Sequence, residues 1–324
     1  YHRVFVYSTP PGVITNGANA VAELGQPSAT AYTSTGAAIT QSGLSGPSGL
    51  AYDPTVQRLF VGDVNNSRVL IFDVNIISNG EVAIDVIGQN TFVGVNNSTT
   101  QRSIVNPRGL AYDVTNNILW ASSIGSNHVK SFSVPTANSP SLVNANGSNA
   151  LNVFGQTINN NNATPDYTGA VSDDMPGTSG LYGVTSSIID SVNHRMFVAD
   201  TINNRVLVYN LNASDDLIDR TPDFVLGQST FYTNTTSYAQ NGMYYPRGLA
   251  YDSVNNRLFV SEQQANRVLV FNVATITNGM NAAFELGQTG FGVSPLTPNP
   301  PTASSLAGPT GIVYDSANNR LFIA

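Results

Sequence analysis

Short apolar runs separated by turn residues recur along the whole chain. In the copy at residues 245–288, apolar runs at 248–251, 258–260 and 268–271 are followed by a short run that closes on a Leu-Gly-Gln step. Runs of this length, rich in β-branched and aromatic residues and bounded by Asn, Asp and Gly, predict β-strands. Each copy therefore predicts four short strands, which in the first copy fall at 49–52, 59–61, 69–72 and 82–87.

Two independent anchors count the copies. The Asp that ends the first run recurs at spacings of 60, 77, 62 and 63 residues, and the closing Gly-Gln step recurs at spacings of 63, 67, 72 and 60 residues. A period of about 65 residues with four strands per period is typical of a propeller blade. The anchor residues are Asp53, Asp113, Asp190, Asp252 and Asp315, and Gly25, Gly88, Gly155, Gly227 and Gly287.

The repeats predict an all-β fold, a five-bladed β-propeller with four-stranded antiparallel blades, as a single domain over residues 1–324. Matching Arg3 to Arg205 and Ala324 to Ala199 makes the two ends complementary halves of one blade. A blade shared between the termini closes the ring and leaves no free sheet edge. The alternative is a six-bladed ring of which part of the chain is missing. The predicted blades lie at about 46–89, 106–156, 178–228, 245–288, and 308–324 joined with 1–26.

The runs GLAYD at 248–252, NRLFV at 256–260 and NRVLVF at 266–271 resemble the NHL-repeat β-propeller family, and similar runs cover essentially the whole chain. Members of this family commonly have six blades, so five copies depart from the usual number. The third copy also departs, because residues 183–190 are three residues longer than residues 248–252. We expect a β-bulge in that copy.

Composition narrows the possible partners. Charged residues make up 10% of the chain and the net charge is −7, so a basic stripe for nucleic acid is not expected. No apolar run approaches the roughly 20 residues that a membrane-spanning helix needs. The absence of cysteine excludes disulfides, thiolate metal sites and cysteine nucleophiles. Low charge, neutral polar loops and the lack of cysteine together favour a secreted or cell-surface protein.

An acidic residue lies five positions before the Arg that opens the third run in three copies. In the second copy both positions change together, to Ser123 and His128, which indicates that the acid and the Arg are partners across a turn. We interpret them as structural ion pairs that brace the turn rather than as catalytic groups. The pairs are Asp63 with Arg68, Asp200 with Arg205, and Glu262 with Arg267.

Candidate chemistry outside these pairs is sparse. Enzymatic relatives of the family, such as the peptidyl-hydroxyglycine lyases, hold a metal through histidines near the propeller axis, but the three histidines here lie on no predicted innermost strand. We therefore expect no metal, no cofactor and no catalytic residue. An acid that recurs in every blade is typical of scaffold, whereas a glycosidase pair should break the symmetry. The least symmetric acids, Asp166, Asp173 and Asp174, favour a solvated loop, with a calcium site as the alternative.

The long connections between blades, at 27–46, 90–106, 157–177, 229–245 and 289–308, should emerge on one face. Long loops on a rigid scaffold commonly carry binding residues. We expect Phe92, Phe231 and Phe291 to fold these loops back, and the tyrosines, which differ between blades, to make contacts. The binding candidates are Tyr32, Tyr167, Tyr232, Tyr238, Tyr244 and Tyr245.

The sequence thus predicts a non-enzymatic extracellular binding or scaffold module. Its first expected partner is a protein or a second copy of the chain, bound on the long-loop face. A carbohydrate-binding, lectin-like propeller that uses Tyr and Asn of the loops is one alternative. A metal-dependent lyase or hydrolase that uses the central funnel is another.

Overall fold

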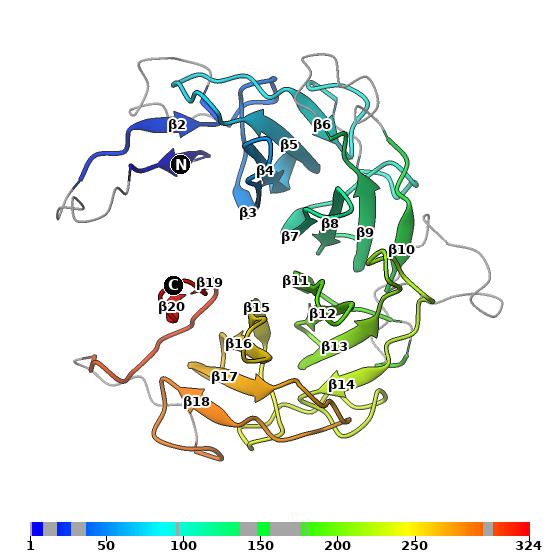
Figure 1. Cartoon of the computed structure of the whole chain (residues 1–324), viewed down its shortest axis with the longest axis vertical. Helices are drawn as coiled ribbons and strands as arrows, with labels where there is room; N and C mark the ends of the chain where they lie inside the picture. Colours follow the sequence, from blue (N-terminus) through cyan, green and yellow to red (C-terminus); the bar gives the residue numbers. More distant parts are fainter. Residues whose placement is uncertain are drawn as a thin grey trace. The chain divides into compact units, whose positions relative to one another are not determined.

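The computed structural model describes residues 2–8, 18–26, 37–94, 97–136, 148–155, 176–178, 180–293 and 301–324. The described residues form four four-stranded sheets and two two-stranded sheets (Figure 1). Strands that follow one another in the chain pair within each sheet, and the pairings are antiparallel. The predicted all-β fold with four-stranded propeller blades is confirmed.

The four full blades share one plan, with strands of seven, six, six and three residues. The first blade contains β3 (Pro47–Asp53), β4 (Arg58–Asp63), β5 (Arg68–Asp73) and β6 (Asp85–Ile87), with a short 3-10 helix at Val64–Asn66. The second contains β7 (Pro107–Asp113), β8 (Ile118–Ser123), β9 (His128–Ser133) and β10 (Asn152–Phe154). The third contains β11 (Val184–Asp190), β12 (Arg195–Asp200), β13 (Arg205–Asn210) and β14 (Phe224–Leu226). The fourth contains β15 (Pro246–Asp252), β16 (Arg257–Glu262), β17 (Arg267–Asn272) and β18 (Phe284–Leu286).

Two pairs of strands stand apart from these blades. β1 (Val4–Val6) pairs with β2 (Ala22–Leu24), and β19 (Ile312–Asp315) pairs with β20 (Arg320–Ile323). The structure gives each pair as a separate two-stranded sheet. Closure of a ring through a blade shared between the termini therefore stays a prediction.

The residues between strands explain where the hairpins turn. The turn between the first two strands ends on a residue with positive φ, and the turn between the second and third strands does the same. Asn tolerates this conformation better than other non-glycine residues, which accounts for the many Asn residues at these places. The residues are Gln57, Asn117, His194, Asn256 and Asn319 in the first turn, and Ser67, Asn127, Asn204 and Asn266 in the second.

The innermost strands contain small residues because neighbouring strands approach closely. A Cβ atom on Gly49 of β3 would lie 2.4 Å from the carbonyl oxygen of Arg108 on β7, and one on Gly248 of β15 would lie 2.4 Å from that of Thr310. Ordinary side chains do not fit at such separations. The close approach of these backbones thus explains the glycines of the first run.

The bulge expected in the third copy is present, since the register of β11 shifts between Val184 and Ser186. The prediction that this copy is three residues longer was wrong, however. β3 and β15 shift in the same place, and Val184 pairs with Asp200 just as Pro246 pairs with Glu262. Gly183 therefore corresponds to Tyr245, not to Gly248, and all three innermost strands have the same length.

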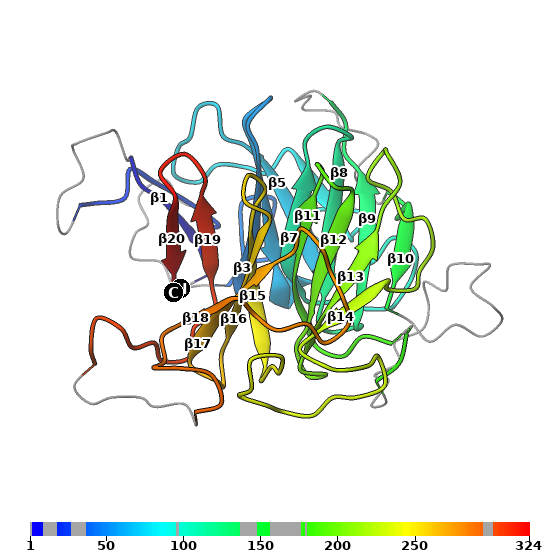
Figure 2. The same ribbon diagram turned by 60° about the horizontal axis from the view of Figure 1, so that its bottom comes forward.

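The outer strands are shorter than the apolar run suggests. The run at 82–87 forms a strand only from Asp85, and the exposed Val82 lies before it. The Asn-Gly pair at 278–279, which precedes the outer strand β18, has a second role, because Asn278 accepts a hydrogen bond at 2.9 Å from the backbone N–H of Val225 on β14. Figure 2 labels β14 and β18, the outer strands of the third and fourth blades. Asn79 accepts the N–H of Glu23 in the same way. These amides cover edges that would otherwise be free.

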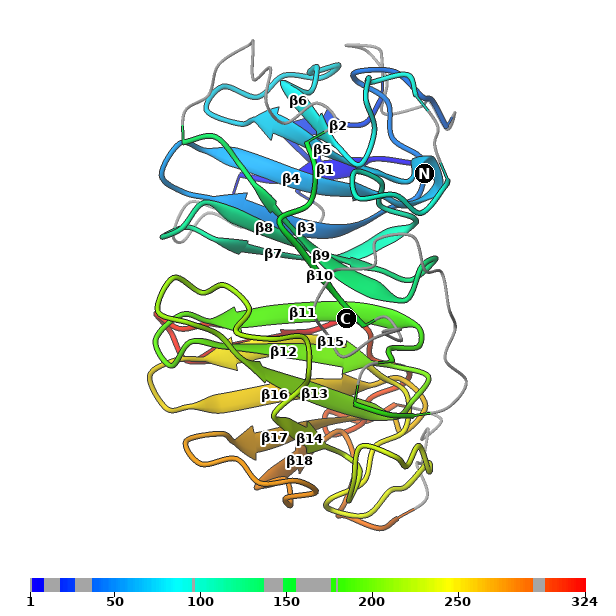
Figure 3. The same cartoon turned by 90° about the vertical axis from the view of Figure 1, so that its right-hand side faces the viewer.

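The contacts between residues divide the chain into two compact units, residues 1–121 with 131–151, and residues 122–130 with 152–324. In the second unit the third and fourth blades, β11–β14 and β15–β18, lie side by side (Figure 3). A hydrophobic cluster with members from both blades buries Phe197, Val208, Leu258 and Phe271. In the first unit a similar cluster joins Leu24 to the first blade. Each unit thus has apolar packing between consecutive sheets.

Candidate functional site

A buried ion-pair network surrounds the Arg that opens the third strand of a blade. In the third blade, Arg205 donates from Nε to Asp200 at 2.7 Å and from a terminal nitrogen to the carbonyl oxygen of Gly180 at 2.9 Å. Asp200 also accepts the N–H of Tyr182 and the side-chain amide of Asn203. The network therefore ties the turn to the segment that enters the blade.

The other two predicted pairs have the same geometry. Arg68 lies 2.7 Å from Asp63, and Arg267 contacts Glu262; in each pair both side chains are almost completely buried. Burial raises the pKa of Asp63 and of Asp200, and it raises the pKa of Glu262 to about 7, in opposition to the arginine and amide donors that lower it. Such pairs hold backbone in place, and none of these carboxylates faces solvent.

The second blade has a neutral counterpart of this network. Ser123, Ser126 and His128 occupy the positions of Asp63, Asn66 and Arg68. The Oγ atoms of Ser123 and Ser126 lie 2.6 Å apart, and Nε2 of His128 lies 3.1 Å from Oγ of Ser126. Burial and the nearby Lys130 hold the pKa of His128 well below its usual value, so the ring is neutral.

A second set of ion pairs was not predicted. Arg58 donates to Asp53 at 2.7 Å and to the hydroxyl of Tyr112 in the next blade at 3.2 Å. Burial would raise the pKa of Asp53, but hydrogen bonds from Thr55 and Arg58 outweigh it and hold the pKa at about 2. Equivalent arrangements join Asp190, Arg195 and Tyr251, and Asp252, Arg257 and Tyr314. The Tyr-Asp step of the repeat is thus a link between neighbouring blades.

Lys130 is the single lysine of the chain and is fully buried on β9. The same position is Leu70, Leu207 or Leu269 in the other full blades. Burial lowers the pKa of Lys130 to about 7. Unfolding restores a normal lysine pKa, so the unfolded chain binds the proton more tightly than the folded chain does. Lys130 therefore destabilises the fold, and this destabilisation grows as the pH falls from about 10 to about 7.

We expect Lys130→Leu to raise the free energy of unfolding at pH 7 by about 1–2 kcal/mol, since an apolar side chain replaces a buried ionisable one. The gain should shrink as the pH rises toward 10, where the lysine is neutral in both states. Urea unfolding at pH 7 and at pH 9.5 measures both values. A variant that is less stable than the wild type at pH 7 would contradict the expectation.

The connection at residues 229–245, here called the tyrosine loop, is held by the ion-pair network. Arg205 donates to the carbonyl oxygen of Phe231, and Arg267 donates to that of Tyr238 at 2.8 Å. Gln228 exchanges hydrogen bonds with the backbone of Thr235 in both directions. Further arginine, amide and backbone contacts of this kind fix the loop along its length.

Four predicted binding residues belong to this loop. Tyr232 is 69% exposed, and the other three tyrosines are half-buried. The rings of Tyr238 and Tyr244 lie 6.0 Å apart in a tilted arrangement, and the guanidinium of Arg247 lies 5.8 Å from the ring centre of Tyr245. The structure thus brings together an aromatic pair and a cation-π pair at one loop.

Tyr245 has an unusual backbone. Its φ is +61°, and the equivalent residue before the other innermost strands is Gly46, Asn106, Gly183 or Gly308, each with positive φ. An aromatic residue in this conformation costs about 1–3 kcal/mol. The backbone N–H of Tyr245 donates a hydrogen bond to Oδ1 of Asn204 at 2.9 Å, which holds the strained residue in place.

Other predicted residues lie elsewhere. Tyr32, Tyr167, Asp166, Asp173 and Asp174 fall outside the described residues. Phe92 and Phe291 are half-buried against the hydrophobic clusters of their units, as expected for residues that fold a loop back.

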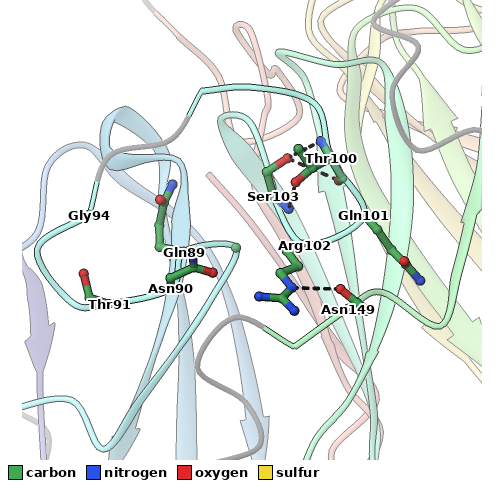
Figure 4. A pocket seen from close by; sticks show the side chains of 10 residues that line it. Gln89, Asn90, Thr91, Gly94, Thr100, Gln101, Arg102, Ser103 and Asn149 are labelled. Atoms are coloured by element: carbon green, nitrogen blue, oxygen red, sulfur yellow. Dashed lines mark hydrogen bonds between the residues drawn. The ribbon is translucent and has the colours of Figure 1, made fainter.

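A pocket of about 450 Å³ lies in the first unit, between the segment that leaves the first blade and the segment that enters the second (Figure 4). Arg102 extends into it and donates from Nε to Oδ1 of Asn149 at 2.9 Å. Sequence reasoning missed this residue, although it is one of the few basic residues outside the repeated positions. The lining residues are Gly88, Gln89, Asn90, Thr91, Gly94, Thr100, Gln101, Arg102, Ser103 and Asn149.

The three histidines lie apart, His128 at the start of β9 and the other two outside the strands. Nδ1 of His2 accepts the N–H of Gly46, and His194 bonds to Asp215 at 2.6 Å. Within the part of the chain that the structure describes, no three His, Asp or Glu side chains gather as a metal site. The same residues include no helix that is long and apolar enough to cross a membrane.

No protein-family model matches this sequence, and no curated protein matches it. Among solved structures, the chain is similar to the crystal structure of a nidogen/laminin complex, with a TM-score of 0.48 and 11% identity over 86% of this chain and 71% of that chain. It is also similar to the β-propeller domain of Cps50 (Swd1) from Myceliophteria thermophila, with a TM-score of 0.46 and 9% identity over 86% of this chain and 62% of that chain. The propeller assignment rests on the blades themselves, and the NHL-type relationship stays a prediction.

Proposed function

We propose that this chain is a non-enzymatic binding module that recognises a protein partner through the tyrosine loop. Tyr and Arg are enriched among the residues that anchor protein interfaces, and Tyr buries a large area with little loss of side-chain entropy. The loop contains Tyr232, the Tyr238–Tyr244 pair and Tyr245, whose ring lies against Arg247 of β15. Low charge, neutral polar loops and the absence of cysteine support a secreted or cell-surface location.

The observation that carries this proposal is the backbone of Tyr245. Glycine would occupy its position without strain, as it does at Gly46, Gly183 and Gly308. The contact of its ring with Arg247 is the one aromatic contact described for it, and a strained aromatic residue where three other copies have glycine supports a contact outside the chain. The hydrogen bonds along the tyrosine loop support the same function, since a loop that is already ordered loses little entropy when a partner binds.

We expect Tyr245→Gly to separate stability from binding. The free energy of unfolding should rise by about 1 kcal/mol, because the strain is relieved. Peptides selected on the wild-type chain from a random library displayed on phage should bind the variant about tenfold more weakly or worse, since an aromatic anchor has been lost. Chemical denaturation and fluorescence anisotropy with the selected peptides measure the two effects.

Tyr52→Ser is the matched control, because it removes an exposed tyrosine from an innermost strand of the other unit. It should leave peptide affinity unchanged. Selected peptides that bind wild type and Tyr245→Gly equally would overturn the proposal. Sedimentation of both proteins identifies a partner that is a second copy, because wild type would then associate with rising concentration and the variant would not.

A further inference from the structure

Three of the loops that enter the blades share a glutamine–alanine pairing, and comparison of these loops shows that Arg102 departs from the repeat. Gln41, Gln101 and Gln240 each donate the side-chain amide to an alanine carbonyl oxygen, at 2.7, 2.9 and 2.8 Å. Each also accepts the N–H of that same alanine at its backbone oxygen. The three loops are therefore equivalent positions of the fold.

The residue after this Gln differs in one loop. It is Ser42 in the first loop, Asn241 in the fourth and Arg102 in the second. The loop does not need an arginine for its own structure, because a small polar residue supports the same pair of hydrogen bonds elsewhere. A departure from the repeat at an exposed position indicates a role outside the scaffold.

The guanidinium of Arg102 is oriented by the protein. Asn149 accepts the Nε hydrogen at 2.9 Å, which leaves the two terminal nitrogens turned into the pocket on the side of Asn90 (Figure 4). Among the described residues, neither terminal nitrogen has a hydrogen-bond partner. Two parallel N–H donors in this geometry match the two oxygens of a carboxylate.

The rest of the lining indicates the body of the ligand. Asn90, Thr91, Thr100 and Asn149 are exposed and offer amide and hydroxyl groups, which both donate and accept hydrogen bonds. Among the described residues, no acidic side chain lines the pocket and Arg102 is the one cation in its lining. Neutral groups of this kind match hydroxyls spaced around a ring, and a single cation matches a single negative charge. A volume of about 450 Å³ accommodates one such ring with its substituents.

We propose that this pocket binds the carboxylate of an acidic monosaccharide, a polyhydroxylated ring such as a uronic acid. Arg102 pairs with the carboxylate through its terminal nitrogens, Asn149 fixes the guanidinium, and Asn90 and Thr100 bond to ring hydroxyls. The site lies in the first unit and does not depend on the tyrosine loop.

The test is an NMR titration of the full chain with sodium glucuronate at low ionic strength. Saturable shifts are expected for the Arg102 Nε–H and for the amides of Asn90 and Thr100. Glucose, which lacks the carboxylate, and N-acetylglutamate, which lacks the ring hydroxyls, should each bind about tenfold more weakly or worse. Arg102→Ser, which installs the residue found at Ser42, should fold normally and lose affinity for glucuronate about tenfold or more.

Arg102→Lys keeps the charge but removes the fork, so it should also bind glucuronate more weakly than wild type. Asn241→Ser, a change at the same position of another loop, should bind glucuronate like wild type. Absence of saturable shifts, or equal affinity of wild type and Arg102→Ser, would overturn the site. Equal affinity for N-acetylglutamate would overturn the sugar and indicate an acidic peptide instead.

Discussion

Arg205→Gln should lower the free energy of unfolding at pH 7 by about 3–5 kcal/mol, because it leaves the fully buried carboxylate of Asp200 without its cation. The carbonyl oxygens of Gly180 and Phe231 lose their donor in the same step. Burial already raises the pKa of Asp200 in the intact network. Without the arginine that pKa must rise further.

The pH dependence of this loss follows from the raised pKa. Above the ordinary carboxylate pKa the unfolded chain releases the proton of Asp200, while the folded variant retains it, so ionisation favours unfolding. The destabilisation should therefore be largest near neutral pH and become smaller as the pH falls toward 4. Urea unfolding of wild type and variant at pH 7 and at pH 4.5 measures the difference.

A double-mutant cycle with Asp200→Asn tests whether the two residues act as partners. The double variant should lose about 1–3 kcal/mol less than the sum of the single losses, since each single variant strands the other partner. Arg257→Gln is a comparison of the same chemistry at a guanidinium that is 37% exposed beside an Asp252 carboxylate that is 1% exposed, and it should cost less than Arg205→Gln. Additive effects at Asp200 and Arg205 would contradict the pairing.

The second blade contains a neutral counterpart of the pair, which supports our interpretation that the pair braces the turn. Ser123, Ser126 and His128 hold the same turn with neutral hydrogen bonds at 2.6 and 3.1 Å. Neutral side chains that bond to one another avoid the cost of taking two charges out of water. Removal of one partner from an ion pair instead leaves the other charge buried without compensation. The chain therefore contains both solutions to one packing problem, and neither places a reactive group at the surface.

The sequence predicted the strands and the turn-bracing pairs because both are local. An apolar run with β-branched residues identifies a strand, and partners five residues apart meet across one turn. The link from Arg58 to Tyr112 could not be predicted in this way, since its members come from different blades. The prediction that the third copy is longer was wrong because it aligned two glycines that have different roles. Gly183 supplies positive φ, whereas Gly248 supplies space.

The candidate site depends on departures from the repeat, which become visible only when the structure aligns the copies. Tyr245 stands where other copies have Gly or Asn, and Arg102 stands where they have Ser or Asn. Neither residue type is unusual in a loop. What distinguishes each residue is its position in the repeat. The backbone conformation identifies that position for Tyr245, and the glutamine–alanine pairing at Gln101 identifies it for Arg102.

Close approach of the innermost strands leads to the second large effect. Gly248→Ala should lower the free energy of unfolding by about 3 kcal/mol, because the new Cβ would lie 2.4 Å from the carbonyl oxygen of Thr310. Backbone cannot rotate away as a side chain does, and the N–H of Gly248 is already held by Ser261 at 2.8 Å. β19 must therefore move, which disturbs the stacked pair of Phe259 and Tyr314 at 5.3 Å.

Thermal denaturation measures the loss, and hydrogen exchange locates it, since amides of β19 and β20 should exchange faster in the variant than those of β11 to β14. Gly290→Ala is the matched control, because no atom of the described residues lies within 4 Å of its new Cβ and its φ is not positive. It should be neutral or slightly stabilising, since alanine restricts the unfolded chain. Equal stability of both variants would mean that β15 and β19 are not packed as closely as the structure places them.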